Sequence, residues 1–383
     1  RTTAMYDIFS DLGAVWGHQF GLEVPNYFAQ DDEPDFENPT FRRSNAFAAT
    51  AREVAAVRHA VGINEVQNFG KIDVHGSGAR EWLDRIMAGR IPKLGRMSLS
   101  PMLSPKGRLL GDFTISCLAD DHFHLTASYG AQEVHLRWFE QNPGSNVRLM
   151  NMSDKRTGFQ IAGPNARKLL AACTRSDVQG IKFLDVRHMT VGQVACTVQR
   201  VSYTGDLGYE IYCDPMDQRQ LWWTLWNAGR PLGIMPFGMR AMMSLRLDRH
   251  FGSWLSEFSP DYTAAETGMD RFVNFKKDVD FIGRSVAEAE RANPPARTLV
   301  TYEVAADDAD VVAYEPVFID GQVQGFCTSG GYSHHQQKSI AMALIPRAHA
   351  QTGAQVEIEI MGKMRRAVQV DPSFDPEMSK MRS

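Results

Sequence analysis

The chain has 383 residues, of which 43% are hydrophobic, so it is long enough for two or three domains with separate apolar cores. Its formal net charge of -4 gives no electrostatic reason to bind nucleic acid or an anionic membrane surface. We therefore expect a globular protein whose ligands are small molecules, with no nucleic-acid and no membrane partner.

The sequence carries none of the common signals for membranes, disulfides or metals. No run approaches the ~18 apolar residues of a membrane span, and the polar start Arg1-Thr-Thr-Ala4 lacks a signal-peptide core. The expected location is the cytoplasm, or the mitochondrial matrix in a eukaryote. The 5 cysteines are scattered without a C-x-x-C and predict reduced, buried thiols. The 11 histidines contain no H-E-x-x-H, so we assign no metal site.

An internal repeat with the pattern apolar-x-Gly-x-x-Ala-Arg-x-x-Leu indicates the organisation of the first 293 residues. Its copies are Val74-His-Gly-Ser-Gly-Ala-Arg-Glu-Trp-Leu83 and Ile161-Ala-Gly-Pro-Asn-Ala-Arg-Lys-Leu-Leu170. Each copy predicts a strand, a glycine turn and a helix, because the glycine ends the strand and the following residues have helical periodicity. We therefore predict two tandem α/β modules, at 1–150 with an N-terminal extension and at 151–293. Gly76-Ser-Gly78 lacks the rest of a dinucleotide fingerprint, so no nicotinamide or flavin site is expected.

Each module contains one acid that follows a glycine-containing turn and begins an apolar strand. Asp112 ends the segment Ser104-Pro-Lys-Gly-Arg-Leu-Leu-Gly-Asp112, and Glu210 ends Tyr203-Thr-Gly-Asp-Leu-Gly-Tyr-Glu210. A carboxylate at such a position can accept hydrogen bonds from paired N–H groups, as in a pterin or guanidine, or can handle a proton. The alternative interpretation is that both are strand-edge acids without chemistry. On the first interpretation, a ligand cleft lies between the modules.

Two helices of the second module have distinct roles. Trp222, Trp223 and Trp226 lie at helical spacing within 217–228, and we interpret them as core anchors. Arg240 falls near a helix start after Gly238, where a guanidinium opposes the helix macrodipole. We therefore expect a specific anionic partner for Arg240, either an Asp or Glu side chain or a ligand carboxylate.

The last ninety or so residues predict a small β-barrel. Pro294-Pro295 indicates a linker, and strand-like segments then alternate with turns over 294–383. These segments are Val317-Phe-Ile319, 321–331 and 356–360.

Six motifs in chain order resemble the aminomethyltransferase family, which has the glycine-cleavage T-protein fold. Besides the two acid-bearing motifs, they are Gly238-Met-Arg-Ala-Met-Met-Ser-Leu-Arg-Leu247, Pro260-Asp-Tyr-Thr-Ala-Ala-Glu-Thr-Gly268, Asp280-Phe-Ile-Gly-Arg284 and Thr328-Ser-Gly-Gly-Tyr-Ser-His334. Phe41-Arg-Arg-Ser-Asn45 and the segment Asp371-Pro-Ser-Phe-Asp-Pro376 are most similar to the folate-binding C-terminal halves of dimethylglycine and sarcosine dehydrogenases. The flavin half of those enzymes has no counterpart in this sequence.

The resemblance implies an α+β fold, a three-domain cloverleaf in which two α/β modules with antiparallel sheets and a C-terminal barrel surround a tetrahydrofolate channel. It implies that Asp112 is the catalytic acid, which accepts or relays a proton at the folate nitrogens. It further implies that Glu210 holds the pterin ring and that Tyr203 and Arg240 contribute to the same cofactor site.

The function that this resemblance predicts is tetrahydrofolate-dependent transfer of a methyl or methylene group from a methylated amine or related donor. Three alternatives stay open: a folate-binding subunit of a flavoprotein amine dehydrogenase or oxidase, a demethylase that acts alone on a sulfonium, ammonium or aryl ether, and a non-catalytic folate-binding protein. Glu65 and Gln67 stand where close relatives carry Asp and Ser, which predicts a changed donor pocket. Arg42 and Arg43 are interpreted as a solvated charge pair outside the site.

Overall fold

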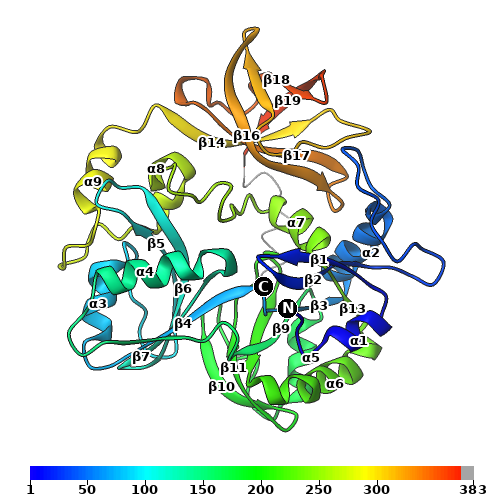
Figure 1. Ribbon diagram of the computed structural model, residues 1–383, viewed down its shortest axis with the longest axis vertical. Helices are drawn as coiled ribbons and strands as arrows, with labels where there is room; N and C mark the ends of the chain where they lie inside the picture. Colours follow the sequence, from blue (N-terminus) through cyan, green and yellow to red (C-terminus); the bar gives the residue numbers. More distant parts are fainter. Residues whose placement is uncertain (372–383) are drawn as a thin grey trace.

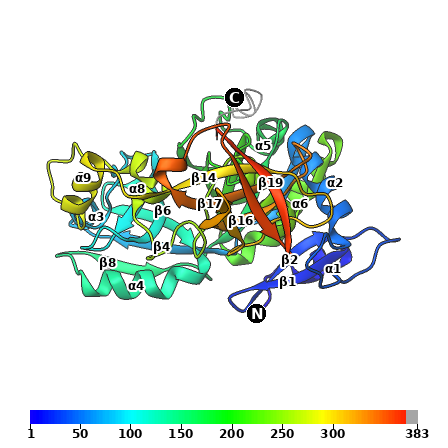
Figure 2. The same cartoon turned by 90° about the horizontal axis from the view of Figure 1, so that it is seen from above.

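The computed structural model describes residues 1–371, which form two sheets with flanking helices and a closed β-barrel. Figure 1 shows the barrel at the top, the first sheet at the left and the second sheet at the bottom, with α7 (Met239–Leu247) between the barrel and the lower elements. In Figure 2 the same elements form a flatter body. The structure confirms the α+β fold of two sheet-containing parts and a C-terminal barrel. Residues 372–376 of the predicted end motif lie outside the described residues.

The first sheet contains the strand that carries Asp112. Its strands, in sheet order, are β5 (Met97–Leu103), β6 (Leu109–Ala119), β7 (His122–Ser128), β4 (Phe69–His75) and β8 (Arg148–Asn151). All neighbouring strands are antiparallel. One face is apolar and packs against α3 (Ala79–Ile86) and α4 (Gln132–Gln141) through residues such as Trp82, Phe113 and Phe139.

The second sheet contains the strand that carries Glu210. Its strands, in sheet order, are β10 (Val186–Val191), β11 (Val194–Gln199), β12 (Gly208–Cys213), β9 (Thr157–Ala162), β3 (Val61–Glu65) and β13 (Ile234–Pro236). The β3–β13 pair is parallel and the other pairs are antiparallel. Strand β3 thus belongs to this sheet although it lies within 1–150. The domain limits at residues 150 and 293 stay a prediction.

The remaining elements are an N-terminal hairpin, the other helices and the strands of the barrel. The hairpin is β1 (Ala14–Gln19) and β2 (Leu22–Phe28), and the other helices are α1 (Tyr6–Asp11), α2 (Ala46–His59), α5 (Ala166–Cys173), α6 (Gln218–Gly229), α8 (Ala264–Thr267) and α9 (Arg284–Ala292). The barrel closes in the order β14 (Arg297–Val304), β17 (Lys338–Pro346), β16 (Gln322–Ser333), β15 (Pro316–Ile319), β18 (Gln355–Ile360) and β19 (Lys363–Val370). Within residues 1–371, no helix is long and apolar enough to cross a membrane. All 5 cysteines are buried and free, as predicted.

The internal repeat folds as predicted, with a glycine between strand and helix in both copies. Gly76 separates β4 from α3 and Gly163 separates β9 from α5, with φ of 118° and 130°. Residues that carry a side chain rarely adopt this backbone conformation. A Cβ would also lie 2.0 Å from the Asn146 carbonyl oxygen at Gly76 and 2.4 Å from the Val57 carbonyl oxygen at Gly163. Both the turn geometry and the close backbone approach therefore require glycine.

The tryptophans of α6 differ in burial, and this difference yields a stability prediction. Trp222 is fully buried and Trp226 packs at the edge of the same core, as predicted, whereas the prediction for Trp223 is wrong because it is 44% exposed. We expect Trp222→Ala to lower the free energy of unfolding by about 3–5 kcal/mol, because it leaves a large cavity.

Trp223→Ala is the matched control, since it removes the same side chain from the next position of the helix. We expect it to change the free energy of unfolding by less than about 0.5 kcal/mol, as is usual for surface substitutions. Urea unfolding followed by circular dichroism measures both variants. Equal losses for the two would contradict the burial of Trp222 and the exposure of Trp223.

Candidate functional site

Asp112 and Glu210 both project from the polar face of their sheets. Along β6, Phe113 and Ile115 belong to the apolar core, so Asp112 points to the opposite face. Along β12, Tyr209 and Ile211 belong to the second core, so Glu210 and Tyr212 also face away from it. The two polar faces meet, because the rings of His124 on β7 and Tyr212 on β12 lie 5.7 Å apart. The two acids thus lie in or beside a polar layer between the sheets.

Glu210 is buried in this layer with one hydroxyl donor and one nearby cation. The Tyr212 hydroxyl donates to Glu210 Oε2 at 2.7 Å, and Glu210 is 6% exposed. Burial raises the pKa of Glu210 to about 7, an effect that the Tyr212 hydrogen bond and the positive charge of Lys71 oppose. A carboxylate in this position gains strongly from further N–H donors because it has little water around it.

Lys71 is a buried cation that the sequence analysis missed. Its Nζ donates to the carbonyl oxygens of Phe69 at 3.0 Å and Ser153 at 3.3 Å. Burial lowers the pKa of Lys71 to about 7, and the charges of Glu65 and Glu210 oppose this shift. Burial likewise raises the pKa of Glu65 to about 7, although Gln218 donates to it. Lys71 alternates with apolar residues of β4, a pattern that predicts a solvated polar face, so nothing in the sequence indicates that this lysine is buried.

Asp112 and Tyr203 are brought close to each other. Burial raises the pKa of Asp112 to about 6. Burial also raises the pKa of Tyr203, and the nearby charge of Asp112 raises it further while Arg246 opposes the shift. The Tyr203 hydroxyl donates to the Gly252 carbonyl oxygen at 2.8 Å, which fixes the ring. The site therefore combines an acid that titrates near neutral pH with a rigid aromatic neighbour.

A buried ion network holds the turn that precedes Glu210. Arg58 of α2 donates to Asp206 in this turn and, at 2.8 Å, to Asp248 after α7. Ser333 of the barrel donates to Asp248 as well. The side chains of Arg58, Asp206 and Asp248 are at most 2% exposed, so the loss of one partner would leave an uncompensated buried charge. The network therefore fixes the position of β12 relative to α2, α7 and the barrel.

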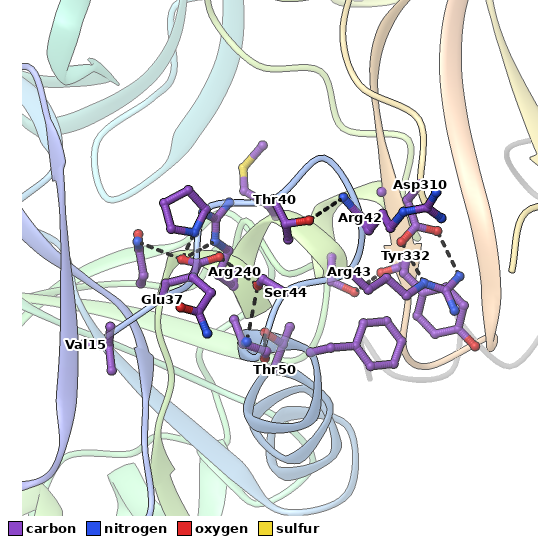
Figure 3. A pocket seen from close by; sticks show the side chains of 18 of the residues that line it. Val15, Glu37, Thr40, Arg42, Arg43, Ser44, Thr50, Arg240, Asp310 and Tyr332 are labelled. Carbon is purple, nitrogen blue, oxygen red and sulfur yellow. Dashed lines mark hydrogen bonds and ion pairs between the residues drawn. The ribbon is translucent and has the colours of Figure 1, made fainter. Parts of the chain in front are cut away.

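Arg240 lies apart from the other predicted site residues, in a cavity on the outer side of α7. The cavity has a volume of about 1010 Å³ and lies between the loop 35–44, α2, α7 and β16 (Figure 3). Its lining includes Arg240 but none of Asp112, Tyr203 and Glu210. Arg240 donates to Glu37 Oε2 at 3.0 Å, which supplies the anionic partner expected from the sequence. Its side chain is still 53% exposed.

The prediction that Arg42 and Arg43 form a solvated pair is wrong for Arg43. Its guanidinium binds both carboxylate oxygens of Asp310 at 3.0 Å (Figure 3). It also lies over the rings of Phe47 and Tyr332. Arg42 is half exposed and pairs with Asp308. These contacts fasten the loop 35–44 to the barrel and form one wall of the cavity. Two adjacent arginines in a sequence do not reveal acidic partners that lie more than 260 residues further along the chain.

Family models match nearly the whole chain. The model described as the GCVT N-terminal domain matches residues 5–277, and the glycine cleavage T-protein C-terminal barrel domain matches residues 297–375. The second match covers the closed barrel. A solved structure, the glycine cleavage system aminomethyltransferase T from Bartonella henselae, superposes with a TM-score of 0.84. It is 22% identical and covers 97% of both chains, so it supports the fold.

Two kinds of curated relatives are similar in sequence. Mitochondrial dimethylglycine dehydrogenase of Rattus norvegicus is 34% identical over 368 residues, which are 95% of this chain and 43% of that protein. The aminomethyltransferase of Geobacillus sp. (strain WCH70) is 31% identical over 331 residues, which are 86% of this chain and 91% of that protein. The chain thus spans less than half the length of the dehydrogenase and nearly all of the aminomethyltransferase.

Proposed function

Because this chain belongs to the glycine cleavage T-protein family, we propose that it transfers a one-carbon unit from a methylated amine or related donor to tetrahydrofolate. The observation that carries the proposal is the polar layer between the two sheets, into which the buried carboxylate of Glu210 projects. Aminomethyltransferases, to which the chain is related, are transferases of one-carbon groups.

The donor and acceptor chemistry of the layer fits tetrahydrofolate. The pterin edge presents two parallel N–H groups, and a carboxylate such as Glu210 accepts both. Tyr212 already donates to Oε2 of Glu210, which keeps the carboxylate in one orientation for the ligand. We propose Tyr203 as a wall of the same site, because its ring is fixed near Asp112. We propose Arg240 as a further folate contact at the cavity, where half of its side chain is exposed.

We assign proton transfer to Asp112. When bound, tetrahydrofolate supplies two nucleophilic nitrogens that capture the one-carbon unit. Where the donor carbon is already at the oxidation level of a methylene group, as in an iminium or aminomethyl group, we propose that Asp112 would accept the proton released at the nitrogen that binds this carbon and would pass it to the departing amine. A carboxylate whose pKa is about 6 can both take and return a proton near neutral pH. Glu210 is 6% exposed, so little water reaches this part of the layer, which would protect a reactive carbon from hydrolysis. A ligand bound by Glu210 would present its nitrogens in a fixed orientation.

A second candidate function is the folate-binding part of an amine dehydrogenase that includes a flavoprotein. It is favoured by the 34% identity to a protein named dimethylglycine dehydrogenase, of which this chain spans 43%. In that case the electrophilic donor arises on the flavoprotein, and this chain completes the transfer.

Calorimetric titration with reduced tetrahydrofolate, followed by turnover assays with methylated amines and sulfonium compounds, tests the proposal. Binding with turnover by the chain alone supports an independent transferase. Turnover that appears only after a flavoprotein amine dehydrogenase is added supports the second candidate. Binding without turnover under either condition indicates a non-catalytic folate-binding protein. Absence of binding overturns the proposal.

A further inference from the structure

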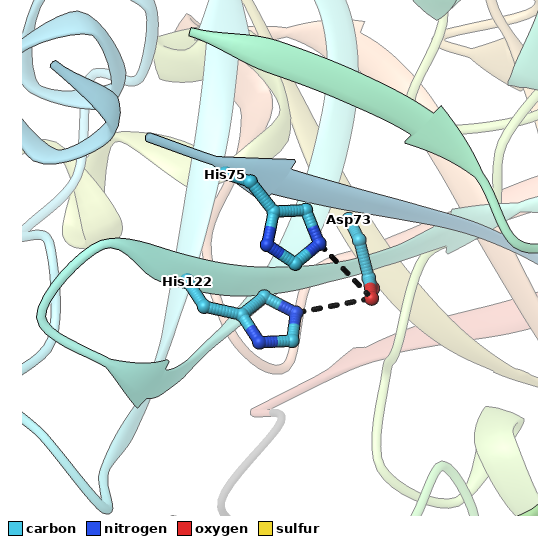
Figure 4. Close-up of side chains that lie close together, drawn as sticks. All are labelled: Asp73, His75 and His122. Atoms are coloured by element: carbon cyan, nitrogen blue, oxygen red, sulfur yellow. Dashed lines mark hydrogen bonds and ion pairs between the residues drawn. The ribbon is translucent and has the colours of Figure 1, made fainter. Parts of the chain in front are cut away.

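Three side chains with metal-binding atoms converge on one face of the first sheet. Asp73 and His75 alternate along β4 and therefore share a face, and His75 is paired in register with His122 on β7. Figure 4 shows both imidazoles beside the Asp73 carboxylate. The rings of His75 and His122 are stacked with their centroids 3.9 Å apart. The three share the polar face of the first sheet with Lys71 and His124. Asp73 contacts His124, whose ring lies 5.7 Å from that of Tyr212.

The distances between the ligand atoms suit a single ion. Nε2 of His122 lies 3.0 Å and Nε2 of His75 lies 3.8 Å from Asp73 Oδ2, and all three ligand atoms lie within 4.8 Å of one another. Metal bonds of about 2.0–2.2 Å place neighbouring ligand atoms roughly 3–3.5 Å apart, so a small rotation of His75 completes the set. We propose that Asp73, His75 and His122 bind a divalent transition-metal ion such as Zn²⁺.

The chemistry of this set favours a transition metal over Mg²⁺ or Ca²⁺. Imidazole nitrogens are good ligands for Zn²⁺, Co²⁺, Ni²⁺ and Cu²⁺, whereas Mg²⁺ and Ca²⁺ require oxygen ligands. The side chains of His75 and His122 are 30% and 25% exposed, so an ion can reach them and water can complete its coordination. Nδ1 of His124 lies 2.6 Å from Asp73 Oδ1 and holds the carboxylate from the buried side.

Arg156 already binds the Asp73 carboxylate, so a metal ion would have to bind beside this positive charge. Its NH2 atom lies 3.3 Å from Asp73 Oδ2, and its NH1 atom lies 3.5 Å from Oδ1. A carboxylate offers about four acceptor positions, so Arg156 can remain on Oδ1 while the ion takes Oδ2. The positive charge of Arg156 repels a metal ion. We therefore expect this site to bind Zn²⁺ more weakly than a dedicated zinc centre does.

The bound ion would tie two parts of the fold together. It would join β4 to β7 through His75 and His122. It would also fix Asp73, whose partner Arg156 directly precedes β9 of the second sheet. Binding to the folded state alone raises stability in proportion to the logarithm of ion concentration. The proposed metal site rests on its own ligand atoms and not on the proposed one-carbon transfer.

The test is calorimetric titration of untagged, metal-free protein with ZnCl2, alongside the ligand-field absorption of added Co²⁺. We expect His75→Asn and His122→Asn each to weaken Zn²⁺ binding at least tenfold and to reduce the Co²⁺ band. His59→Asn, which changes an exposed histidine at the end of α2, should bind as the wild type does. MgCl2 should give no binding heat.

Thermal unfolding supplies a second readout. We expect ZnCl2 to raise Tm of the wild type and of His59→Asn, and to leave Tm of the double variant His75→Asn/His122→Asn unchanged. Both imidazoles are partly exposed, so circular dichroism should confirm that the variants fold. The proposal is overturned if the wild type binds Zn²⁺ no more tightly than the folded double variant.

Discussion

Replacement of Asp112 by Asn should reduce kcat at least ~100-fold, the usual contribution of one proton-transferring side chain, while tetrahydrofolate still binds. The Asn side chain keeps the shape of Asp112 but cannot accept a proton. Steady-state turnover and calorimetric titration, measured on the same preparation, separate these two effects. Loss of both turnover and binding would show that Asp112 holds the ligand, and retention of both would remove it from the site.

Ser116→Ala is the control for this substitution, because Ser116 shares the polar face of β6 with Asp112. Within residues 1–371 its buried hydroxyl has no hydrogen-bond partner, so its removal should leave kcat and stability almost unchanged. A large loss of kcat or of stability in Ser116→Ala would mean that any substitution on this face of β6 disturbs the fold. The loss of kcat in Asp112→Asn would then not be evidence for proton transfer.

The pH dependence of the rate provides an independent check on Asp112. Burial raises its pKa to about 6, so the proton acceptor is ionised only above that value. We expect kcat to rise as pH increases through about 6 in the wild type. The residual rate of Asp112→Asn should lack this acidic limb. If kcat of the variant still rose with pH through about 6, the titrating group would not be Asp112.

Replacement of Glu210 by Gln should weaken tetrahydrofolate binding roughly 10- to 100-fold, since hydrogen bonds to a charged group contribute about 1.5–3 kcal/mol each. The amide offers one acceptor oxygen and presents N–H groups of its own to the donors of the ligand. Tyr212→Phe is the matched control, because it removes the hydroxyl donor and keeps the carboxylate. We expect a smaller loss of affinity in Tyr212→Phe, and equal losses would contradict the role given to Glu210.

The affinity for tetrahydrofolate should also depend on pH through Glu210. Burial raises the pKa of Glu210 to about 7, so affinity should fall as pH drops below about 7 and the carboxylate takes up a proton. Gln at this position should abolish that dependence. In Tyr212→Phe the midpoint should move to higher pH, because the Tyr212 hydrogen bond lowers the pKa of Glu210. The groups that face Glu210 are Tyr212 and Lys71, and the pKa of Lys71 also lies near 7.

Protein stability must be followed in the same pH range. A carboxyl whose pKa is raised in the folded state favours folding at low pH, and this contribution is lost as pH rises from the ordinary value to about 7. The lowered pKa of Lys71 has the opposite sign, because the uncharged amine is favoured in the folded state above about 7. Circular dichroism at each pH therefore shows whether a change in affinity reflects the ligand site or unfolding.

The sequence by itself determined the local elements and the order of the parts. The strand, glycine turn and helix of both repeats, the burial of Trp222, the helix start before Arg240 and the barrel all follow from periodicity, glycine conformation and breaker residues within a few positions. These features depend on backbone preferences and amphipathic spacing, which neighbouring residues carry.

Only the tertiary structure decided which distant residues meet. Arg240 pairs with Glu37 and Arg43 with Asp310, so a helix-start arginine and an apparently solvated one both became parts of a cavity wall. Lys71 lies near Glu210 because the two polar faces meet, and His75 faces His122 because β4 pairs with β7. Such contacts depend on strand register and on how the sheets and barrel pack, to which residues from the whole chain contribute together.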